Sequence, residues 1–543
     1  MVYCGKPSLA CDRCRARSPS CTQCIRAKVE CPGYRDPLDW SFRDQSDDVI
    51  LKSQRSARKK RTAPSLPAST SSSSPSLETY SQNSPALPSL KNSLVYSVQE
   101  QAKAHIFTHY MSGGPCGGHM SYLLPLTNHS PHSAVNTALT AVGLAALSNI
   151  RMSPRMMLKA RQEYTTALSQ TNHALKTPAL SKRDDILAAV VLLGMFEVMT
   201  CSDNLFIDRW MKHIEGAAKL IEFRGSEQLS RLEGLELFTN LRAQIVSRRK
   251  ISTNMLTLKD GQTLSSIYQE KYSSSIMTQL TEDAKQHRNP DDRIIDEVSI
   301  IVVRLNDLCA ALKDGTLTQP SEIIRCTLNL DADLVSLLLT APPAWSYTTV
   351  KVPIVDGQPI TNLVWGDNYH VYRNLAVSSM WNNARSARIL MHEMILEAVK
   401  LLEDSSPANS GFHHSQVLAN QSRDAARRLV DDICASVPFH MGMGIDNNYD
   451  WNGSGHESTV IPPSFEISGA GGVALMWPLL IAANCGLASL ELRQWITRCL
   501  EKIGHSMGIH QALAMAQILR NGMHTRAWIT PDGSPVESPT TIL

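Results

Sequence analysis

The segment AVNTALTAVGLAALSNI occupies residues 134–150. Its apolar side chains recur at steps of three and four residues, which is the spacing of one face of an α-helix. The side chains on that face are Val135, Leu139, Val142, Ala146 and Ile150. The segment therefore predicts a helix that packs one face against a core, and it favours a mainly α fold.

A similar helical pattern extends over most of the chain from about residue 96 onward. Further helices are expected near residues 156–175, 186–200, 207–223, 294–313, 375–403, 416–436, 473–488 and 490–521. Pro178, Gly225 and Pro343 act as breaks between these helices. We therefore expect residues 96–543 to form one large all-α body.

Residues 345–372 depart from the helical pattern. They are rich in Val, Ile, Thr and Tyr, and Asp356-Gly357 lies in their middle. Residues of this kind on both sides of an Asp-Gly pair are typical of a β-hairpin. A small hairpin on the helical body is therefore expected.

The composition of the 543-residue chain is that of a protein with a sizeable core, since 43% of its residues are hydrophobic and 19% are charged. Its longest apolar stretch, Ile186 to Met199, is too short to cross a bilayer and contains Glu197. This stretch predicts a buried core helix, and we expect no membrane segment and no membrane partner. The first residues also lack the apolar run of a signal peptide, which disfavours a secreted disulfide framework.

Residues 41–95 form a low-complexity segment that includes PSLPASTSSSSP at 64–75. Such a composition cannot bury enough apolar surface to offset its chain entropy, so a disordered linker is expected. A basic run inside it consists of Arg55, Arg58, Lys59, Lys60 and Arg61. This run is a candidate nuclear-import signal or a source of extra phosphate contacts, and solvated linker charge is the alternative.

Positive charge is concentrated near the start of the chain. Residues 1–61 contain fourteen Lys or Arg and seven Asp or Glu, whereas the remaining 482 residues carry a net charge of −4. A basic head on a near-neutral body indicates that the head binds a polyanion.

Six of the thirteen cysteines are clustered in the first 31 residues, at positions 4, 11, 14, 21, 24 and 31. Cys11 with Cys14 and Cys21 with Cys24 form two C-x-x-C pairs, and six residues separate each pair from a further cysteine. In a reducing compartment, thiols at such spacing are typical of a metal site, and thiolates are soft donors that suit zinc. Because so short a segment needs metal to fold, the pattern predicts a small zinc-cysteine domain over residues 1–40.

With this cysteine motif the chain resembles the fungal binuclear zinc-cluster transcription factors. Their head has the pattern C-x2-C-x6-C, a loop, and then C-x2-C-x6-C. The similarity also covers Met1–Ser8, Cys31–Arg35, His105–Met111, Ala141–Ile150, Leu187–Thr200, Trp210–Gly225, Trp381–His392 and Gly469–Leu480. It therefore extends past the linker into most of the helical body.

The resemblance implies a function. Members of this family are zinc-dependent DNA-binding regulators of RNA polymerase II genes, often of metabolic or secondary-metabolite gene sets. It implies nuclear localisation, and double-stranded DNA and the transcription machinery or co-regulators as partners. It also implies that residues 96–543 form a helical regulatory domain. Family regulators often bind DNA as dimers, so a homodimer is left open.

The two halves of the cluster share a cysteine in this chain, which departs from the six ligands of the family. Cys11, Cys14 and Cys21 have first-half spacing, while Cys21, Cys24 and Cys31 have second-half spacing. Carried over by position, Cys11 and Cys21 bridge two metals. Cys24 and Cys31 then complete one zinc, and Cys14 is a lone ligand of the other. Members of the family bind two zincs, whereas the hypothesis for this chain is a single zinc. A second explanation of the shortened spacing is that an exon segment is missing between codons 14 and 21.

The resemblance also implies the DNA contacts. In the family, a short helix of the first half contacts base edges through Lys and Arg. The residues of this kind that remain here are Arg13, Arg15 and Arg17. Phosphate contacts, which position a protein without reading sequence, are implied for Arg26, Lys28 and Arg35. The alternative is a regulatory or scaffold protein of the same family that has lost specific DNA binding and acts through protein contacts.

Motif-like segments of the helical body do not support catalysis. Gly469–Ala474 imitates a phosphate-binding G-x-G-x-x-A loop, but no clear strand precedes it, so it is interpreted as a helix start. His392-Glu393 cannot begin a zinc-protease motif, because Leu396 stands where the second histidine is needed. His413 and His414 are interpreted as loop residues. The scattered cysteines 201, 309, 326, 434, 485 and 499 are interpreted as small core residues, and no enzyme is expected.

Overall fold

The computed structural model describes residues 96–111, 120–128, 133–200, 206–253, 275–352, 354–355, 358–359, 363–405, 412–443 and 468–521. All of them belong to the unit that spans Asn92–Leu543. The zinc head predicted for residues 1–40 and the linker predicted for residues 41–95 lie outside the described residues. Both stay predictions, as does the division of the chain into three domains.

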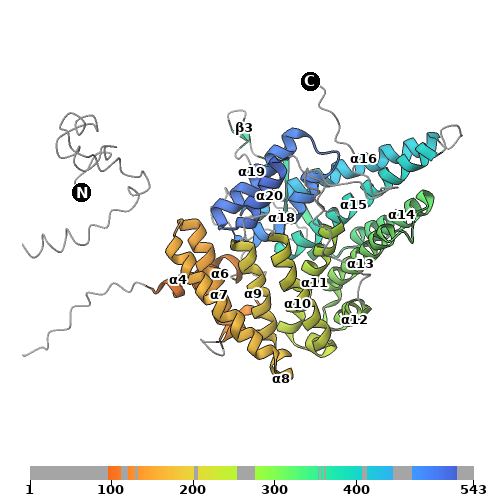
Figure 1. Ribbon diagram of the computed structural model, residues 1–543. Helices are drawn as coiled ribbons and strands as arrows, with labels where there is room; N and C mark the ends of the chain where they lie inside the picture. The colour runs from red at the N-terminus through yellow and green to blue at the C-terminus, as the bar shows by residue number, and fades with distance from the viewer. Residues whose placement is uncertain are drawn as a thin grey trace, which may run out of the picture. The chain divides into compact units, whose positions relative to one another are not determined.

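The described part of the chain is mainly α-helical, as Figure 1 shows. Its α-helices are α4 (Val98–Ile106), α5 (Leu123–Thr127), α6 (Ala134–Arg151), α7 (Pro154–Leu175), α8 (Pro178–Ser181), α9 (Asp184–Thr200), α10 (Phe206–Arg224), α11 (Leu232–Thr253), α12 (Ser275–Ala284), α13 (Ile294–Lys313), α14 (Pro320–Leu339), α15 (Leu375–Ser405), α16 (Phe412–Ala435), α17 (Val437–His440), α18 (Gly469–Asn484), α19 (Leu490–Met507) and α20 (His510–Arg520). Short turns of other helix types are η2 (Phe107–Met111), η3 (Ser226–Ser230), η5 (Lys285–His287), η6 (Pro290–Arg293) and η7 (Pro343–Trp345). The expectation of a mainly α fold is confirmed for these residues.

Two short antiparallel β-ladders lie between η7 and α15. β1 (Tyr347–Lys351) pairs with β4 (Asn368–Tyr372), with Tyr347 opposite Tyr372. β2 (Ile354–Val355) pairs with β3 (Gln358–Pro359) on the two sides of Asp356-Gly357. The hairpin predicted within residues 345–372 is therefore confirmed.

The helices form two groups, each around its own hydrophobic core. In the first group α6 packs against α4, α7 and α9, and the C-terminal helices α19 and α20 return to pack against α6 and α9. In the second group α13, α14 and α15 pack together and α15 also contacts β4. Figure 1 shows the first group in orange, yellow and blue and the centre of the second in green and cyan. Several helices connect the groups: α11 contacts α10 and α13, α15 contacts α13 and α18, and α17 contacts β4 and α18.

The contact between α4 and α6 depends on a glycine. A Cβ atom at Gly143 would overlap the backbone of Ala102, so no larger residue lets the two helices approach this closely. The start of α4 is fixed by a capping box, in which Ser97 Oγ accepts from the Glu100 N–H over 3.1 Å and Glu100 Oε2 accepts from the Ser97 N–H over 2.7 Å. These contacts hold α4, and η2 after it, against the first core.

The apolar stretch at residues 186–199 is buried as predicted. It forms most of α9, and its side chains from Ile186 to Phe196 are all inside the first core. None of the described helices combines the length and the apolarity needed to cross a bilayer. Gly469 begins α18, so the interpretation of Gly469–Ala474 as a helix start is also confirmed.

Two expectations about local structure were wrong. Residues 490–521 form two helices and not one, because Gly508 takes a left-handed backbone with φ of +71° and ends α19 before α20 begins. His413 and His414 are not loop residues, because α16 begins at Phe412 and includes them in its first turn. The helix was expected from residue 416, and the structure extends its start by four residues.

Candidate functional site

The metal ligands, DNA contacts and import run predicted from the sequence all lie in residues 1–61, outside the described residues. The structure therefore does not test which of them come together. Among the described residues, no three His, Cys, Asp or Glu side chains are grouped as a metal site. The candidate site that the structure does describe is a pair of cavities between the two groups of helices.

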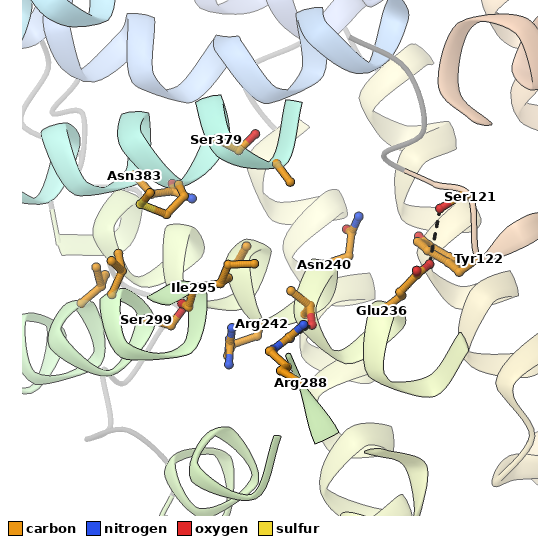
Figure 2. Close-up of a pocket in the computed structure, with 16 residues that line it drawn as sticks. Ser121, Tyr122, Glu236, Asn240, Arg242, Arg288, Ile295, Ser299, Ser379 and Asn383 are labelled. Atoms are coloured by element: carbon orange, nitrogen blue, oxygen red, sulfur yellow. Dashed lines mark hydrogen bonds between the residues drawn. The ribbon is translucent and has the colours of Figure 1, made fainter. Parts of the chain in front are cut away.

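The first cavity has a volume of about 260 Å³ and is lined mainly by α11, α13 and α15. Ser121, Tyr122 and Arg288 close its remaining sides (Figure 2). The second cavity has a volume of about 150 Å³ and is lined by α9, α10, α11, α15 and α18, together with Tyr110 of η2 and Gln511 of α20. The two cavities adjoin, because the same side chains of α11 and α15 line both of them.

A buried ion cluster forms the floor of the first cavity. Arg242 of α11 donates from Nη1 to Oδ1 of Asp296 on α13 over 2.7 Å, and Arg288 donates from Nε to the other carboxylate oxygen over 2.6 Å. Arg288 Nη2 also donates to Thr239 Oγ1. Figure 2 draws the two arginines close together at the edge of the cavity. Two guanidinium groups share one carboxylate, so the cluster has an excess of positive charge.

Arg242 has donor atoms that are not hydrogen-bonded within the described residues. Its residue is 1% exposed, and its Nε and Nη2 have no partner among the described residues. Burial lowers the pKa of Arg242, while Asp296 opposes that shift. A buried guanidinium N–H without an acceptor costs free energy on the order of 1–3 kcal/mol. Arg242 therefore has two donor nitrogens without an acceptor among the described residues, at the edge of the cavity that it lines.

Glu236 faces the opposite side of the first cavity. Ser121 Oγ donates to Glu236 Oε2 over 3.4 Å, as the dashed line in Figure 2 marks. Burial raises the pKa of Glu236 above its ordinary value, and the bond from Ser121 works against that shift. Beside it Tyr122 is 3% exposed, and its hydroxyl has no partner among the described residues. This side of the cavity therefore offers a carboxyl group and a phenol hydroxyl.

Aromatic side chains form the wall of the second cavity. The rings of Trp210 on α10 and Trp477 on α18 stack with centroids 5.7 Å apart and an interplanar angle of 28°. Tyr110 lies against Gly469 at the start of α18, where any Cβ atom would overlap the phenol ring. The Tyr110 hydroxyl and the Gln511 side-chain amide are buried, and neither Tyr110 Oη nor Gln511 Nε2 has a partner among the described residues. This end of the space is apolar, and Tyr110 and Gln511 are two polar residues among those that line it.

A buried serine–histidine pair lies apart from the cavities. His440 Nδ1 is 3.1 Å from the carbonyl oxygen of Gly471, which can only accept, so Nδ1 carries the proton. His440 Nε2 is therefore the acceptor for Ser378 Oγ at 2.7 Å. Both side chains are 0% exposed and neither lines the two cavities, and the pair joins α15, α17 and α18.

A second buried cluster holds the hairpin on α15. Arg385 donates to Tyr372 Oη over 2.6 Å and contacts the ring of Tyr347, 4.8 Å from its centroid. Its Nη2 is 3.2 Å from His370 Nδ1, which must accept because a guanidinium only donates. Burial, and then the charge of Arg385, lowers the pKa of His370 to about 3. These cation–π and hydrogen-bond contacts hold the hairpin against α15.

The cysteines of the helical body behave mostly as expected. Cys309, Cys434, Cys485 and Cys499 are buried. Cys326 is only partly buried and its Sγ lies 3.5 Å from Glu322 Oε1, so it is not a core residue. Cys201 lies outside the described residues.

Sequence reasoning did not find the ion cluster. Arg242 and Asp296 lie on separate helices, and each is surrounded in the sequence by the mixture of apolar and charged residues that a solvent-exposed helix also has. The sequence signal for the cluster was Asp296 within the helix predicted at 294–313. A charged residue of a helix is usually exposed to solvent, so Asp296 alone does not indicate a buried ion pair. The cavities were likewise not predicted.

Residues 103–294 match the family model of the fungal specific transcription factor domain. Transcription factor dbaG of Emericella nidulans is 24% identical over 415 residues, which cover 74% of this chain and 86% of that protein. An uncharacterised protein of the same organism, AN5342, is 25% identical over 228 residues, which cover 40% of this chain and 47% of that protein. No solved structure matches the chain.

The family match covers the whole run from α4 to the start of α13, which includes Arg242 and Arg288. The aligned segment covers 86% of Transcription factor dbaG, so the similarity extends over most of that protein. These similarities support a role in transcription regulation, and they identify residues 103–294 as a segment similar to the fungal specific transcription factor domain.

Proposed function

We propose that this protein is a nuclear transcription regulator that binds double-stranded DNA through a zinc-dependent head and is controlled through its helical body. The observation that carries the proposal is the match of residues 103–294 to the fungal specific transcription factor domain, in a chain that also begins with a basic, cysteine-rich head. A regulator needs no catalytic site, so the protein acts by binding and not as an enzyme. Co-regulators or the transcription machinery are its partners at the helical body.

The head supplies the chemistry of DNA binding. Thiolates of Cys11, Cys14, Cys21, Cys24 and Cys31 would hold zinc, which is preferred by sulfur donors in tetrahedral sites. A metal-stabilised loop presents side chains at fixed positions, and guanidinium groups match the acceptor pair of guanine in the major groove. The arginines near the first C-x-x-C pair would then read bases, and the basic residues after the second would contact phosphates.

A second candidate function is favoured by the shortened cysteine motif. Five cysteines with one shared between the halves supply fewer ligands than two tetrahedral zincs require, even with two bridging thiolates. A head that holds a single zinc would present its arginines less rigidly, and specific DNA binding would be lost. The protein would then act as a scaffold through protein contacts of its helical body alone.

Zinc counting separates a one-zinc from a two-zinc head. The full-length protein is purified with zinc and its metal content is measured by native mass spectrometry. One zinc is expected for the shortened motif, Cys21→Ser should release it, and Cys4→Ser serves as the matched control that retains it. Two zincs in the unchanged chain would overturn the single-zinc hypothesis, and sequencing the transcript across codons 14 to 21 tests the missing-exon explanation.

Retention on DNA separates the regulator from the scaffold. The full-length protein is incubated with genomic DNA fragments in moderate salt, with zinc and then with a chelator. A regulator enriches particular fragments above the nonspecific background and loses that enrichment with the chelator. Salt-sensitive binding without any preferred fragment would instead support the scaffold function.

A further inference from the structure

The two cavities adjoin at a set of shared lining residues. Asn240 and Ala243 of α11 and Ser379 and Asn383 of α15 line both. The combined volume is close to the lower end of the range for small-molecule sites in proteins, about 300–1,000 Å³. The helices that line this space come from both groups: α9, α10 and α18 from the first, α13 and α15 from the second, and α11 between them. An occupant would therefore contact both groups.

One end of this space is suited to an anion. Arg242 and Arg288 share the single carboxylate of Asp296, and two N–H groups of Arg242 have no acceptor among the described residues. Glu236 also lines this end, but it is hydrogen-bonded to Ser121, away from the pair of arginines in Figure 2. A carboxylate is the acceptor that a guanidinium fork binds best, through two parallel hydrogen bonds.

The other end is suited to an aromatic ring. Trp210 and Trp477 provide flat apolar surface, and Met195 and Met476 line the same cavity with polarisable sulfur. Tyr110 Oη and Gln511 Nε2 lack partners among the described residues, so they can hydrogen-bond a hydroxyl or carbonyl substituent. Between the two ends, Ser379 Oγ also lacks a partner among the described residues.

We propose that the joined cavity binds one small aromatic carboxylic acid, with its carboxylate at Arg242 and its ring system directed toward Trp210 and Trp477. The occupant contacts helices of both groups, so binding couples their arrangement. The assignment of this ligand as an effector rests on the proposed function as a transcription regulator. Binding itself does not depend on that function.

The test uses 2-naphthoate as the probe and 2-naphthamide as its uncharged analogue. Each is titrated into the zinc-loaded full-length protein without DNA, and heat is recorded by isothermal titration calorimetry. We expect 2-naphthoate to bind with one-to-one stoichiometry and a Kd below about 1 mM. The amide should bind at least about tenfold more weakly, because it forms no charge-assisted pair with Arg242. Absence of any heat with 2-naphthoate, or equal binding of the two probes, would overturn the proposal.

Two variants locate the site. Ala243→Leu places a larger side chain at the junction of the cavities and should abolish binding of 2-naphthoate. Ala179→Leu is the control: this residue of α8 is also exposed but lines neither cavity, so binding should be unchanged. Arg242→Lys keeps the charge beside Asp296 but loses the fork, and should weaken binding about tenfold. Thermal unfolding of each variant checks that it is folded. Unchanged binding in folded Ala243→Leu would place the probe elsewhere and refute the site.

The outcomes for ligand and DNA are independent. If the protein binds 2-naphthoate at this site and retains no specific DNA fragment, the cavity proposal stands and the regulator proposal fails. If it retains specific DNA but binds no probe, the reverse holds.

Discussion

The phenol ring of Tyr110 lies directly against the α-carbon of Gly469, so that the turn after α4 and the start of α18 meet without a side chain between them. The neighbouring residues strengthen this contact, since Ser468 Oγ donates to the carbonyl oxygen of His109 over 3.0 Å. The contact fixes the position of the Tyr110 hydroxyl in the second cavity. It also joins the first described helix to one of the last.

Gly469→Ala tests this contact. The added methyl group overlaps the Tyr110 ring, which is 1% exposed and cannot move away without disturbing the core. We expect a loss of about 1–3 kcal/mol in the free energy of unfolding, which is typical of overpacking. Gly216→Ala is the matched control, because a Cβ atom at that position of α10 meets nothing within 4 Å and alanine favours a helix. Urea unfolding of the full-length protein measures both, and equal stability of the two variants would contradict the prediction.

Asp296→Asn tests the ion cluster. The substitution leaves Arg242 and Arg288 buried without their shared counter-charge, and breaking a buried pair in this way costs about 3–5 kcal/mol. Asp333→Asn removes a comparable partner from Arg304, but both of those side chains are about half exposed, so about 0–1 kcal/mol is expected. Thermal and urea unfolding of the two variants provide the comparison. Similar losses in both would mean that Asp296 does not stabilise the junction of the two groups of helices.

Glu393 on α15 should make the stability of the protein depend on pH. Burial raises its pKa to about 7, although the Gly486 N–H donates to its Oε1 over 3.0 Å. The folded protein therefore binds this proton more tightly than the unfolded chain, and the stability that it contributes is present at pH 4 and is lost as the pH rises from about 4.5 to 7. The slope contributed by one such group is at most about 1.4 kcal/mol per pH unit.

Glu393→Gln removes this contribution and should flatten the fall in stability between pH 5 and 7. The difference between the unchanged protein and the variant is the quantity to measure, because His370 acts in the opposite direction: burial lowers its pKa to about 3, so its contribution rises with pH. Glu227→Gln, at an exposed position of η3, leaves Glu393 in place and should keep the original pH profile. Superimposable profiles of all three proteins would refute the role of Glu393.

The sequence predicts helices well where apolar positions repeat with the helical period. This holds even for α6, which was expected to pack one face but is buried on all sides from Ala134 to Ser148. α6 and α13 begin and end within a residue of the expected ranges, since their apolar positions repeat with the helical period. α11 was not predicted, because it contacts both groups of helices and its buried residues, among them Leu235, Phe238 and Leu241, are mixed with charged side chains. These apolar side chains pack in the first core, but Glu236, Asn240 and Arg242 stand among them in the sequence. The pattern of α11 is therefore hard to distinguish from a polar segment.

The candidate site could not be predicted in the same way. Arg242 and Asp296 are separated by a whole helix and a segment outside the described residues, and nothing in either local pattern says that the two side chains meet. The orphan polar atoms of Tyr110 and Gln511 likewise become evident only when the fold buries them. Local periodicity reports burial, whereas a site depends on contacts between distant segments. The cysteine motif differs, because its predicted ligands lie within 21 residues of one another in the chain.

The last prediction concerns the basic residues of the head. It separates residues that contact bases from residues that contact phosphates. Replacing Arg26, Lys28 and Arg35 together by alanine removes three proposed phosphate contacts, so the slope of log K against log salt concentration should become shallower by about 0.9 for each contact, with little change in the preference for specific over nonspecific DNA. Replacing Arg13, Arg15 and Arg17 should instead reduce that preference, because base contacts carry about 1–3 kcal/mol of discrimination each. Fluorescence anisotropy with the full-length protein at several salt concentrations measures both quantities. Lys219→Ala, at an exposed position of α10, is the control for a lost charge outside the head. If both triple variants lowered the salt slope and left the preference intact, the arginines of the first C-x-x-C pair would be positioning residues, and specificity would have to come from elsewhere in the protein.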